Sequence, residues 1–433
     1  MANSIENSME SLSRRKRLLI LFLLAFGTTA MYSLPYLKSS FYDPMQKALG
    51  LTHIEIGNLL SLYGLIGMFS YFFGGWFADR FSLRNLISFS LLASGGLGFW
   101  FATFPSYNTI LLIHVLWGVT TILTFFAASI KVVRMQGTEK EQGRIFGFYE
   151  GLSGVSGTLI SFTGLYFFGK FAEAAIGFRY VVWLYSGASV VCGILLFFLI
   201  AHRGGNTNSD NAEEEKTTFR SLMSVVTMPK AWLIGLIIFS TYVVFSSLTY
   251  LSPYLSQVYV VPITLVTALS IIRTYVIKMV ASPVAGIVTD KVGSSISVMF
   301  VGFIIMAVNC ALFLVIPKGN AFMWFAVVNM VVLSALLFAF RGIYFASVAE
   351  SKIPMKTTGA VVGFASFIGF SPDAFYYSVA GYWLDKYGET GYSYIFMLSV
   401  GCSLLGVVAT FLLRQINRRE AAGGGAMTLP VSA

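Results

Sequence analysis

Residues 75–84 read Gly75-Trp-Phe-Ala-Asp79-Arg80-Phe-Ser-Leu-Arg84, and residues 286–293 read Gly286-Ile-Val-Thr-Asp290-Lys291-Val-Gly293. Both place an aspartate four residues after a glycine and a cation directly after the aspartate, in a short loop between two apolar runs. A glycine lets helices approach closely, and the aspartate can cap the next helix or pair with a cation of its loop. We interpret the two stretches as latches that hold one conformational state and release in another.

Apolar runs surround these loops along the chain. Of the 433 residues 56% are hydrophobic and 11% are charged, whereas a soluble domain carries roughly 25% charged residues. Runs of about 20 residues can cross a bilayer, and backbone pairing in lipid requires them to be helices. We predict an all-α membrane protein with twelve spans, at residues 18–38, 55–78, 85–105, 108–130, 144–168, 179–201, 231–255, 262–288, 296–316, 322–348, 359–383 and 392–413.

A polar stretch at residues 202–230 divides the spans into two sets of six and has the composition of a solvated linker. The sets repeat each other: Gly187 and Gly401, Ser189 and Ser403, and Phe197 and Phe411 share an offset of 214 residues. Such an internal duplication is typical of transporter folds. The predicted parts are a segment 1–17, a six-helix bundle 18–201, the linker 202–230, a second bundle 231–413 and a tail 414–433.

The basic residues predict the orientation. With an even number of spans both chain ends lie on one side, and that side holds 20 of the 29 lysines and arginines. The rich side is cytoplasmic by the positive-inside rule, so we expect a multi-pass protein of the plasma membrane, in bacteria the inner membrane, with both termini in the cytoplasm. The net charge of +10 then reflects this topology, and we expect no nucleic-acid partner. The opposite side holds Lys38, Lys47, Lys170, Arg179, Lys318 and Lys386.

The first stretch resembles the loop 2–3 signature of the major facilitator superfamily, Gly-x-Leu-Ala-Asp-Arg-x-Gly-Arg-Arg/Lys. Phe77, Ser82 and Leu83 depart from it. The resemblance implies two pseudo-symmetric six-helix bundles around a central cavity lined by spans 1, 4, 7 and 10, which rocking would expose to each side in turn. Residues 34–42 and 371–375 resemble bacterial inner-membrane sugar or organic-anion permeases. The matching residues are Gly75, Ala78, Asp79, Arg80 and Arg84, and in the second copy Gly286, Asp290, Lys291 and Gly293.

Three cations lie inside predicted spans, where a charge is costly unless it pairs or lines a wet cavity. Arg273 and Lys278 belong to span 8, and Lys278 stands near the midplane, about 18 Å from Asp290 at 1.5 Å per residue. Arg341 belongs to span 10, and a guanidinium fork suits a carboxylate, sulfonate or phosphate. We predict that these three bind solute. The alternative is that they pair with acids of neighbouring helices or reach out to the interface.

Two acids are embedded as well. Asp373 follows Pro372, which removes a backbone donor and kinks span 11. Glu150 lies among glycines of span 5, where desolvation would raise its pKa and suit it to carry a proton. For both acids, proton coupling and purely structural pairing are equally open.

Hydroxyl-bearing aromatic residues gather on the presumed cavity helices. Tyr32 and Tyr36 stand in span 1 and Tyr250 in span 7, and Tyr36 and Tyr250 share the 214-residue offset. Such side chains suit a hydroxylated or carboxylated solute. Contacts between helices and an interfacial aromatic belt are the alternative reading.

These residues favour a secondary transporter of a small organic anion, such as an acidic sugar or carboxylate, coupled to protons. Export of amphipathic or cationic compounds through Glu150 and Asp373 is the alternative, and a membrane sensor would need a signalling domain larger than the linker or tail. We expect no enzyme and no cofactor, because metal-ligand spacings, Walker loops and nucleophile elbows are missing from the sequence. The expected partners are the solute, protons and lipid, with a monomeric chain.

Overall fold

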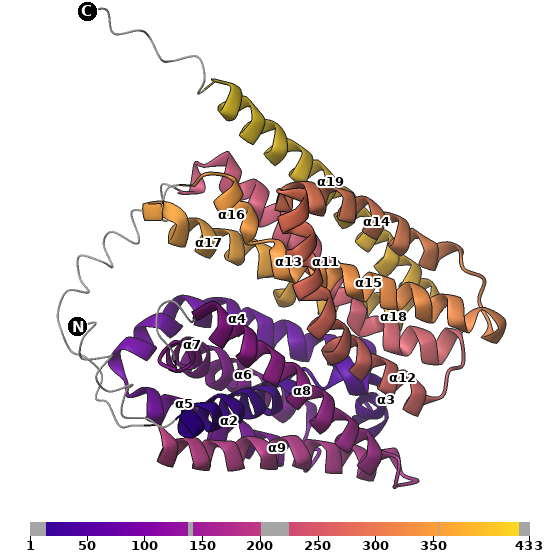
Figure 1. Ribbon diagram of the computed structural model, residues 1–433. Coiled ribbons are helices and arrows are strands. Elements are labelled where there is room, and N and C mark those ends of the chain that lie inside the picture. Colours follow the sequence, from indigo (N-terminus) through magenta and orange to yellow (C-terminus); the bar gives the residue numbers. More distant parts are fainter. Residues whose placement is uncertain (1–13, 137–141, 201–224, 354, 424–433) are drawn as a thin grey trace, which may run out of the picture.

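The computed structural model describes residues 14–136, 142–200, 225–353 and 355–423, and these are helical throughout, with turns between the helices. The side chains of residues 71–76 and 79, among them Gly75 and Asp79, lie outside the described set. The same holds for most of the predicted segment 1–17 and linker 202–230 and for the end of the tail. Figure 1 shows two groups of helices, an indigo-to-magenta group from α2 to α9 and a pink-to-yellow group from α11 to α19.

The first group contains the helices before the predicted linker. Its elements are α2 (Arg14–Ser33), α3 (Lys38–Leu49), α4 (His53–Arg80), α5 (Leu83–Phe101), α6 (Tyr107–Gly118), the π-helix η1 (Val119–Phe126), α7 (Ala127–Arg134), α8 (Gln142–Phe168) and α9 (Ala174–Leu199). We call this group the N-half.

The second group, the C-half, contains the helices after the linker. Its elements are α11 (Pro229–Val258), α12 (Ile263–Ile271), the π-helix η3 (Ile272–Ile277), α13 (Lys278–Val292), α14 (Ser295–Val315), the 3-10 turn η4 (Asn320–Phe322), α15 (Met323–Ile343), α16 (Ala346–Glu350), α17 (Met355–Phe370), the 3-10 turn η5 (Ser371–Ala374), α18 (Tyr376–Tyr387) and α19 (Glu389–Gly423).

Among the described residues, nine helices are long and apolar enough to cross a membrane. The remaining predicted spans, 55–78, 85–105 and 359–383, fall on α4, on α5 and on the broken helix α17–η5–α18. The all-helical membrane fold is therefore confirmed, whereas the count of twelve stays a prediction. We call the face at which α2 begins and α19 ends the terminus face, and the opposite one the far face.

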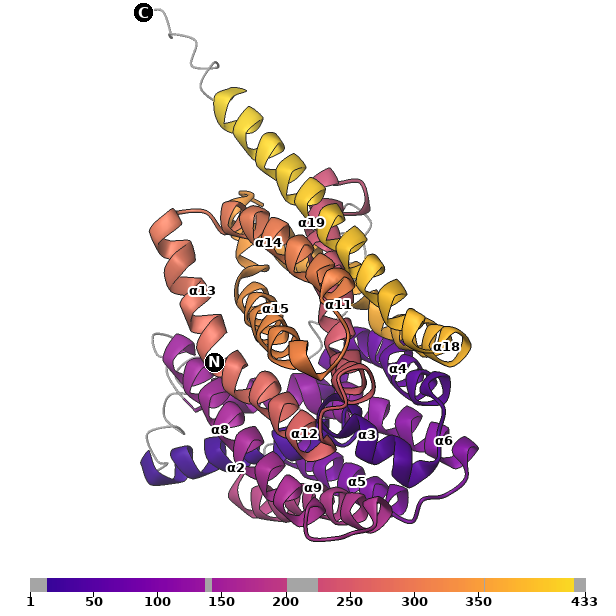
Figure 2. The same cartoon turned by 90° about the vertical axis from the view of Figure 1, so that its right-hand side faces the viewer.

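Helix α3 is an element that the sequence did not predict. Pro35 ends α2 at Ser33, because the residue before a proline is pushed out of helical geometry. A new helix, α3, begins at Lys38 and ends at Leu49. Gly50 caps it with a φ of +64° and an N–H that donates to the Gln46 carbonyl. Most of α3 is buried. It packs on α9 of its own half and on α11 and α12 of the C-half, so it lies between the halves at the far face (Figure 2).

Pro372 breaks span 11, as the sequence predicts. Helix α17 ends at Phe370, the 3-10 turn η5 covers Ser371–Ala374, and α18 starts at Tyr376. The break packs against α4 of the N-half. As a result, the carboxylate of Asp373 lies where the two halves meet.

Candidate functional site at the junction of the two halves

The halves meet closely where α4 packs on α18, near the far face. A Cβ atom on Gly57 of α4 would lie 2.2 Å from the Tyr377 carbonyl oxygen, and one on Gly381 of α18 would lie 2.4 Å from the His53 carbonyl oxygen. Both neighbours are backbone atoms, which cannot rotate aside. Glycine at these two positions is therefore what allows the helices to touch.

Asp385 of α18 caps the first turn of α4 across this junction. Its Oδ1 accepts the His53 N–H at 3.0 Å and its Oδ2 accepts the Ile54 N–H at 2.6 Å. The next N–H, that of Glu55, donates to Thr52 Oγ1 within a capping box. One carboxylate of the C-half thus satisfies two exposed donors at the N-terminus of an N-half helix, where the helix dipole also favours negative charge.

This junction repeats the spacing of the two predicted latches. Residues 381–388 carry a glycine, an aspartate four residues later, a lysine and a final glycine, Gly381, Asp385, Lys386 and Gly388. The sequence analysis missed this third copy, because it stands on the side predicted to be poor in cations. Here the pattern does what was expected of the others: the glycine admits a neighbouring helix and the aspartate caps it.

The second latch, in contrast, makes no such contact in this conformation. A Cβ on Gly286 would meet nothing within 4 Å, and Asp290 and Lys291 are exposed. Asp290 does not cap α14. The N-cap of that helix is Ser294, whose hydroxyl oxygen accepts the Ser297 N–H. Glu350 accepts the Ile296 N–H at 3.0 Å. In the first copy, Arg84 lies over the Phe197 ring at 4.4 Å. The latch role of Gly75, Asp79, Arg80, Arg84, Gly286, Asp290 and Lys291 stays a prediction.

Removing the Asp385 cap is expected to loosen the far face. An N-cap replaced by alanine costs about 0.5–2 kcal/mol, so Asp385→Ala should raise the population with separated halves by about 2- to 30-fold. Spin labels on Lys47→Cys and Lys318→Cys, both exposed and on opposite halves, would report it as a longer distance. Glu173→Ala, an exposed acid of the N-half far face, should leave the distances unchanged, and an unchanged Asp385→Ala would contradict the role of the cap.

Arg273 belongs to the far-face closure. Its side chain is 2% exposed. The guanidinium donates to the Leu248 carbonyl of α11 and, at 2.8 Å, to the Ser39 carbonyl of α3. Both acceptors are backbone groups, one from each half, so in this conformation the guanidinium joins the halves and offers no free face to a solute. The predicted solute role of Arg273 finds no support in this geometry.

Lys278 and Glu150 form an ion pair between the halves, with Nζ and Oε2 at 3.2 Å. Their side chains are 42% and 60% exposed. Glu150 is therefore neither desolvated nor unpaired, so its surroundings give no support to the predicted proton-carrying role. Lys278 is neutralised by the same contact. Lys278 is the first residue of α13, and this helix contacts α8, to which Glu150 belongs.

Asp373 is the centre of a polar cluster near the junction. It is 9% exposed, and its Oδ2 accepts the Tyr242 hydroxyl at 3.1 Å while Oδ1 has no hydrogen bond. The carboxylate interacts electrostatically with two cations, Arg341 of the C-half and Lys38 of the N-half. Neither comes within ion-pair distance of it. This arrangement joins two predicted site residues, Asp373 and Arg341, to Lys38, which was predicted only as the last residue of span 1.

Arg341 lies half-buried at the end of α15. Its guanidinium carbon is 4.4 Å from the centroid of the Phe245 ring and 5.9 Å from that of Tyr242. No hydrogen bond or ion pair joins it to the rest of the described chain. Stacking on an aromatic face orients the guanidinium plane and leaves its edge donors available. Among the three predicted cations, Arg341 therefore fits an anion best.

The three predicted tyrosines differ in their surroundings. Tyr36 is half-buried, packs edge-on against Tyr63 and interacts electrostatically with Asp373 and Tyr242. Tyr32 donates its hydroxyl to the Thr121 carbonyl at 2.7 Å. Tyr250 is 1% exposed and donates to the Tyr377 carbonyl at 2.7 Å. Only Tyr36 therefore belongs to the Asp373 cluster, whereas Tyr32 and Tyr250 hold helices together.

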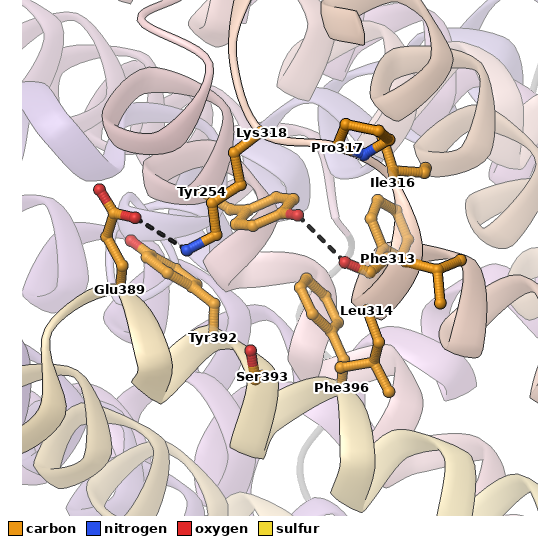
Figure 3. Close-up of a pocket in the computed structure, with 11 residues that line it drawn as sticks. Tyr254, Phe313, Leu314, Ile316, Pro317, Lys318, Glu389, Tyr392, Ser393 and Phe396 are labelled. Carbon is orange, nitrogen blue, oxygen red and sulfur yellow. Dashed lines mark hydrogen bonds and ion pairs between the residues drawn. The ribbon is translucent and has the colours of Figure 1, made fainter.

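A cavity of about 260 Å³ at the far face of the C-half shares no lining residue with this cluster. Figure 3 shows that its charged groups pair with each other, Lys318 with Glu389 at 2.9 Å, and that Tyr254 donates to the Phe313 carbonyl. We assign it no solute.

Comparison with known proteins supports the fold over most of the chain. Residues 18–375 match the family model of the Major Facilitator Superfamily. The inner membrane protein YihN of Escherichia coli (strain K12) is 33% identical over 94% of this chain and 98% of its own length. The inner membrane protein YqcE of the same strain is 28% identical over 92% and 95%.

Solved structures show the same architecture. One is a bacterial homolog of the human lysosomal transporter Spinster in an inward-facing and unoccupied conformation. The alignment covers 94% of this chain and 98% of that one, with a TM-score of 0.70 and 12% identity. The chain also covers 99% of the nucleoside transporter NupG, solved as a point mutant, with 91% of this chain aligned, a TM-score of 0.71 and 15% identity. At such identities the likeness concerns the fold alone.

Proposed function

Because the chain belongs to the Major Facilitator Superfamily and is thus a membrane transporter rather than an enzyme, we propose that its solute is a small organic anion, an acidic sugar or a carboxylate, moved with protons. One observation carries the proposal: Arg341 lies at the junction with its guanidinium stacked on Phe245 and without an acceptor among the described residues. A half-buried fork of donors that the protein leaves unused suits a carboxylate or sulfonate.

The contacts between the halves fit alternating access. The halves touch through α3, α4 and α18 at the far face, while Gly286 and Asp290 at the terminus face are not engaged. With the positive-inside assignment, the terminus face is cytoplasmic in a bacterial inner membrane, and this conformation faces inward. Engagement of the terminus-face latches would accompany the opposite state.

The competing function, export of cationic compounds, is less well supported. It needs two binding acids, but Glu150 is paired with Lys278 and Asp373 already faces two cations. A cationic solute would have to enter a region of net positive charge.

Uptake into proteoliposomes tests the proposal. Labelled hexuronates, aldonates and hydroxycarboxylates are offered with and without an inward proton gradient, each beside a neutral analogue. We expect saturable uptake of at least one anion, faster with the gradient, because a bound proton would offset the charge of the solute. Uptake confined to neutral sugars and unaffected by Arg341→Ala would contradict the anion assignment, and uptake indifferent to the gradient would remove the coupling.

A further inference from the structure

Lys38 is a buried cation. Its side chain is 1% exposed, and its Nζ has no hydrogen-bond partner in the part of the chain that the structure describes. The Nζ lies 3.9 Å from the centroid of the Tyr377 ring and 5.7 Å from that of Tyr250. Lys38 is also the first residue of α3, where the helix dipole disfavours positive charge. Two ring faces thus lie against an ammonium that stands in a costly position.

An unpaired atom of opposite charge lies in the same buried region. Asp373 Oδ1 accepts no hydrogen bond, and the Asp373 carboxylate and the Lys38 ammonium interact electrostatically without forming an ion pair. Buried polar groups in folded proteins are nearly always bonded, and an exception calls for a missing partner. Two such exceptions, on Lys38 and on Asp373, which also interacts with Arg341, point to a missing polar partner.

We propose that Lys38 is the second solute-binding cation and that Asp373 is the counter-ion which the solute displaces. The inference rests on the proposed function and deepens it. Lys38 comes from the N-half and Arg341 from the C-half, so one anionic group held by both would bridge the halves. In the empty site the Asp373 carboxylate offsets one of the two positive charges, and an entering anion takes its place.

The charges explain why a proton would follow. Lys38, Arg341 and ionised Asp373 together carry one net positive charge. A monovalent anion cancels it, so the carboxylate then lies in a neutral site and gains a proton more readily. Binding of anion and proton is thus mutually favourable, as linkage requires. The result is symport with one proton per anionic charge, without a separate proton-carrying residue such as Glu150.

The groups around Asp373 allow the pH dependence to be assigned to it. Arg341 and Lys38 interact with it from α15 and α3, and a bound anion favours the charged form of both. The remaining neighbours are phenols, which do not ionise near neutral pH. They are Tyr36 before α3, Tyr63 on α4, Tyr242 on α11 and Tyr377 on α18.

The inference is tested by measuring how the purified full-length protein binds the same hexuronates, aldonates and hydroxycarboxylates. A pH dye measures the proton uptake that accompanies binding. Loss of one charge-assisted contact should weaken binding about 10- to 100-fold in Lys38→Gln, and Lys38→Arg should retain most of it. Asp373→Asn should bind the anion more tightly than wild type, without proton uptake and without pH dependence. Lys318→Gln, an exposed far-face lysine, should bind as wild type does.

The two proposals fail in different ways. If no anion binds to wild type, the anion function itself is wrong, and the role of Lys38 is wrong with it. If wild type binds an anion and Lys38→Gln binds it equally well, only the role of Lys38 is overturned. If Asp373→Asn binds more weakly than wild type or still takes up a proton, counter-ion displacement is overturned.

Discussion

Gly57→Ala is expected to keep the far face from closing and to reduce transport severely. The added methyl group would lie 2.2 Å from the Tyr377 carbonyl oxygen and 2.7 Å from its carbon. Since the obstacle is backbone, relief requires α4 and α18 to separate, which also withdraws Asp385 from the first turn of α4. Overpacking of this kind costs about 1–3 kcal/mol or more, so the closed population should fall about fivefold to more than a hundredfold.

Two measurements check this result. Spin-label distances between positions 47 and 318 should lengthen, and solute uptake into proteoliposomes should fall in proportion to the lost closed state. Gly96→Ala on α5 is the matched control, because its Cβ would meet nothing within 4 Å. A Gly57→Ala protein with wild-type distances and uptake would show that the α4–α18 contact does not close the far face.

Arg341→Gln should abolish recognition of the anion. The guanidinium edge is the only strong donor that the C-half described here presents toward Asp373 without a protein acceptor. Hydrogen bonds to charged groups contribute about 1.5–3 kcal/mol each, so the apparent Kd should rise more than a hundredfold if both donors of the fork are lost. Arg341→Lys keeps the charge but loses the fork and the flat contact with Phe245, so we expect an intermediate Kd.

Arg179→Gln is the control for Arg341. Arg179 is also stacked on a phenylalanine, with its guanidinium carbon 4.7 Å from the Phe104 ring, but it donates to the Ala102 carbonyl at the far face. Its replacement should leave the Kd for the anion unchanged. Equal loss in both variants would mean that Arg341 acts through stability rather than through the solute.

The membrane fold could be predicted because its cause is local. Apolar runs of spanning length must be helical in lipid, and Pro372 breaks its helix for a reason visible in the sequence. The placing of Arg341 beside Asp373 was within reach too, since an embedded charge must find water, a partner or a solute.

The partners of the other charges depend on how the halves pack, which no local pattern contains. Arg273 and Arg341 look alike in sequence, yet one bonds two backbone carbonyls and the other faces an aromatic ring. Lys38 is the last residue of the predicted span 18–38 and was placed at the membrane surface opposite the termini. Because α3 folds back between the halves, this lysine is buried instead. The pattern of residues 381–388 could have predicted the contact of α18 with α4 from the sequence. It lies on the side that was predicted to be poor in cations.

A density map of the protein with a bound anion tests the account most directly. The account predicts the anionic group of the solute within hydrogen-bond distance of the Arg341 guanidinium, at the junction beside Asp373. A solute bound with its charged group on Lys278, or elsewhere with Arg341 untouched, would contradict it.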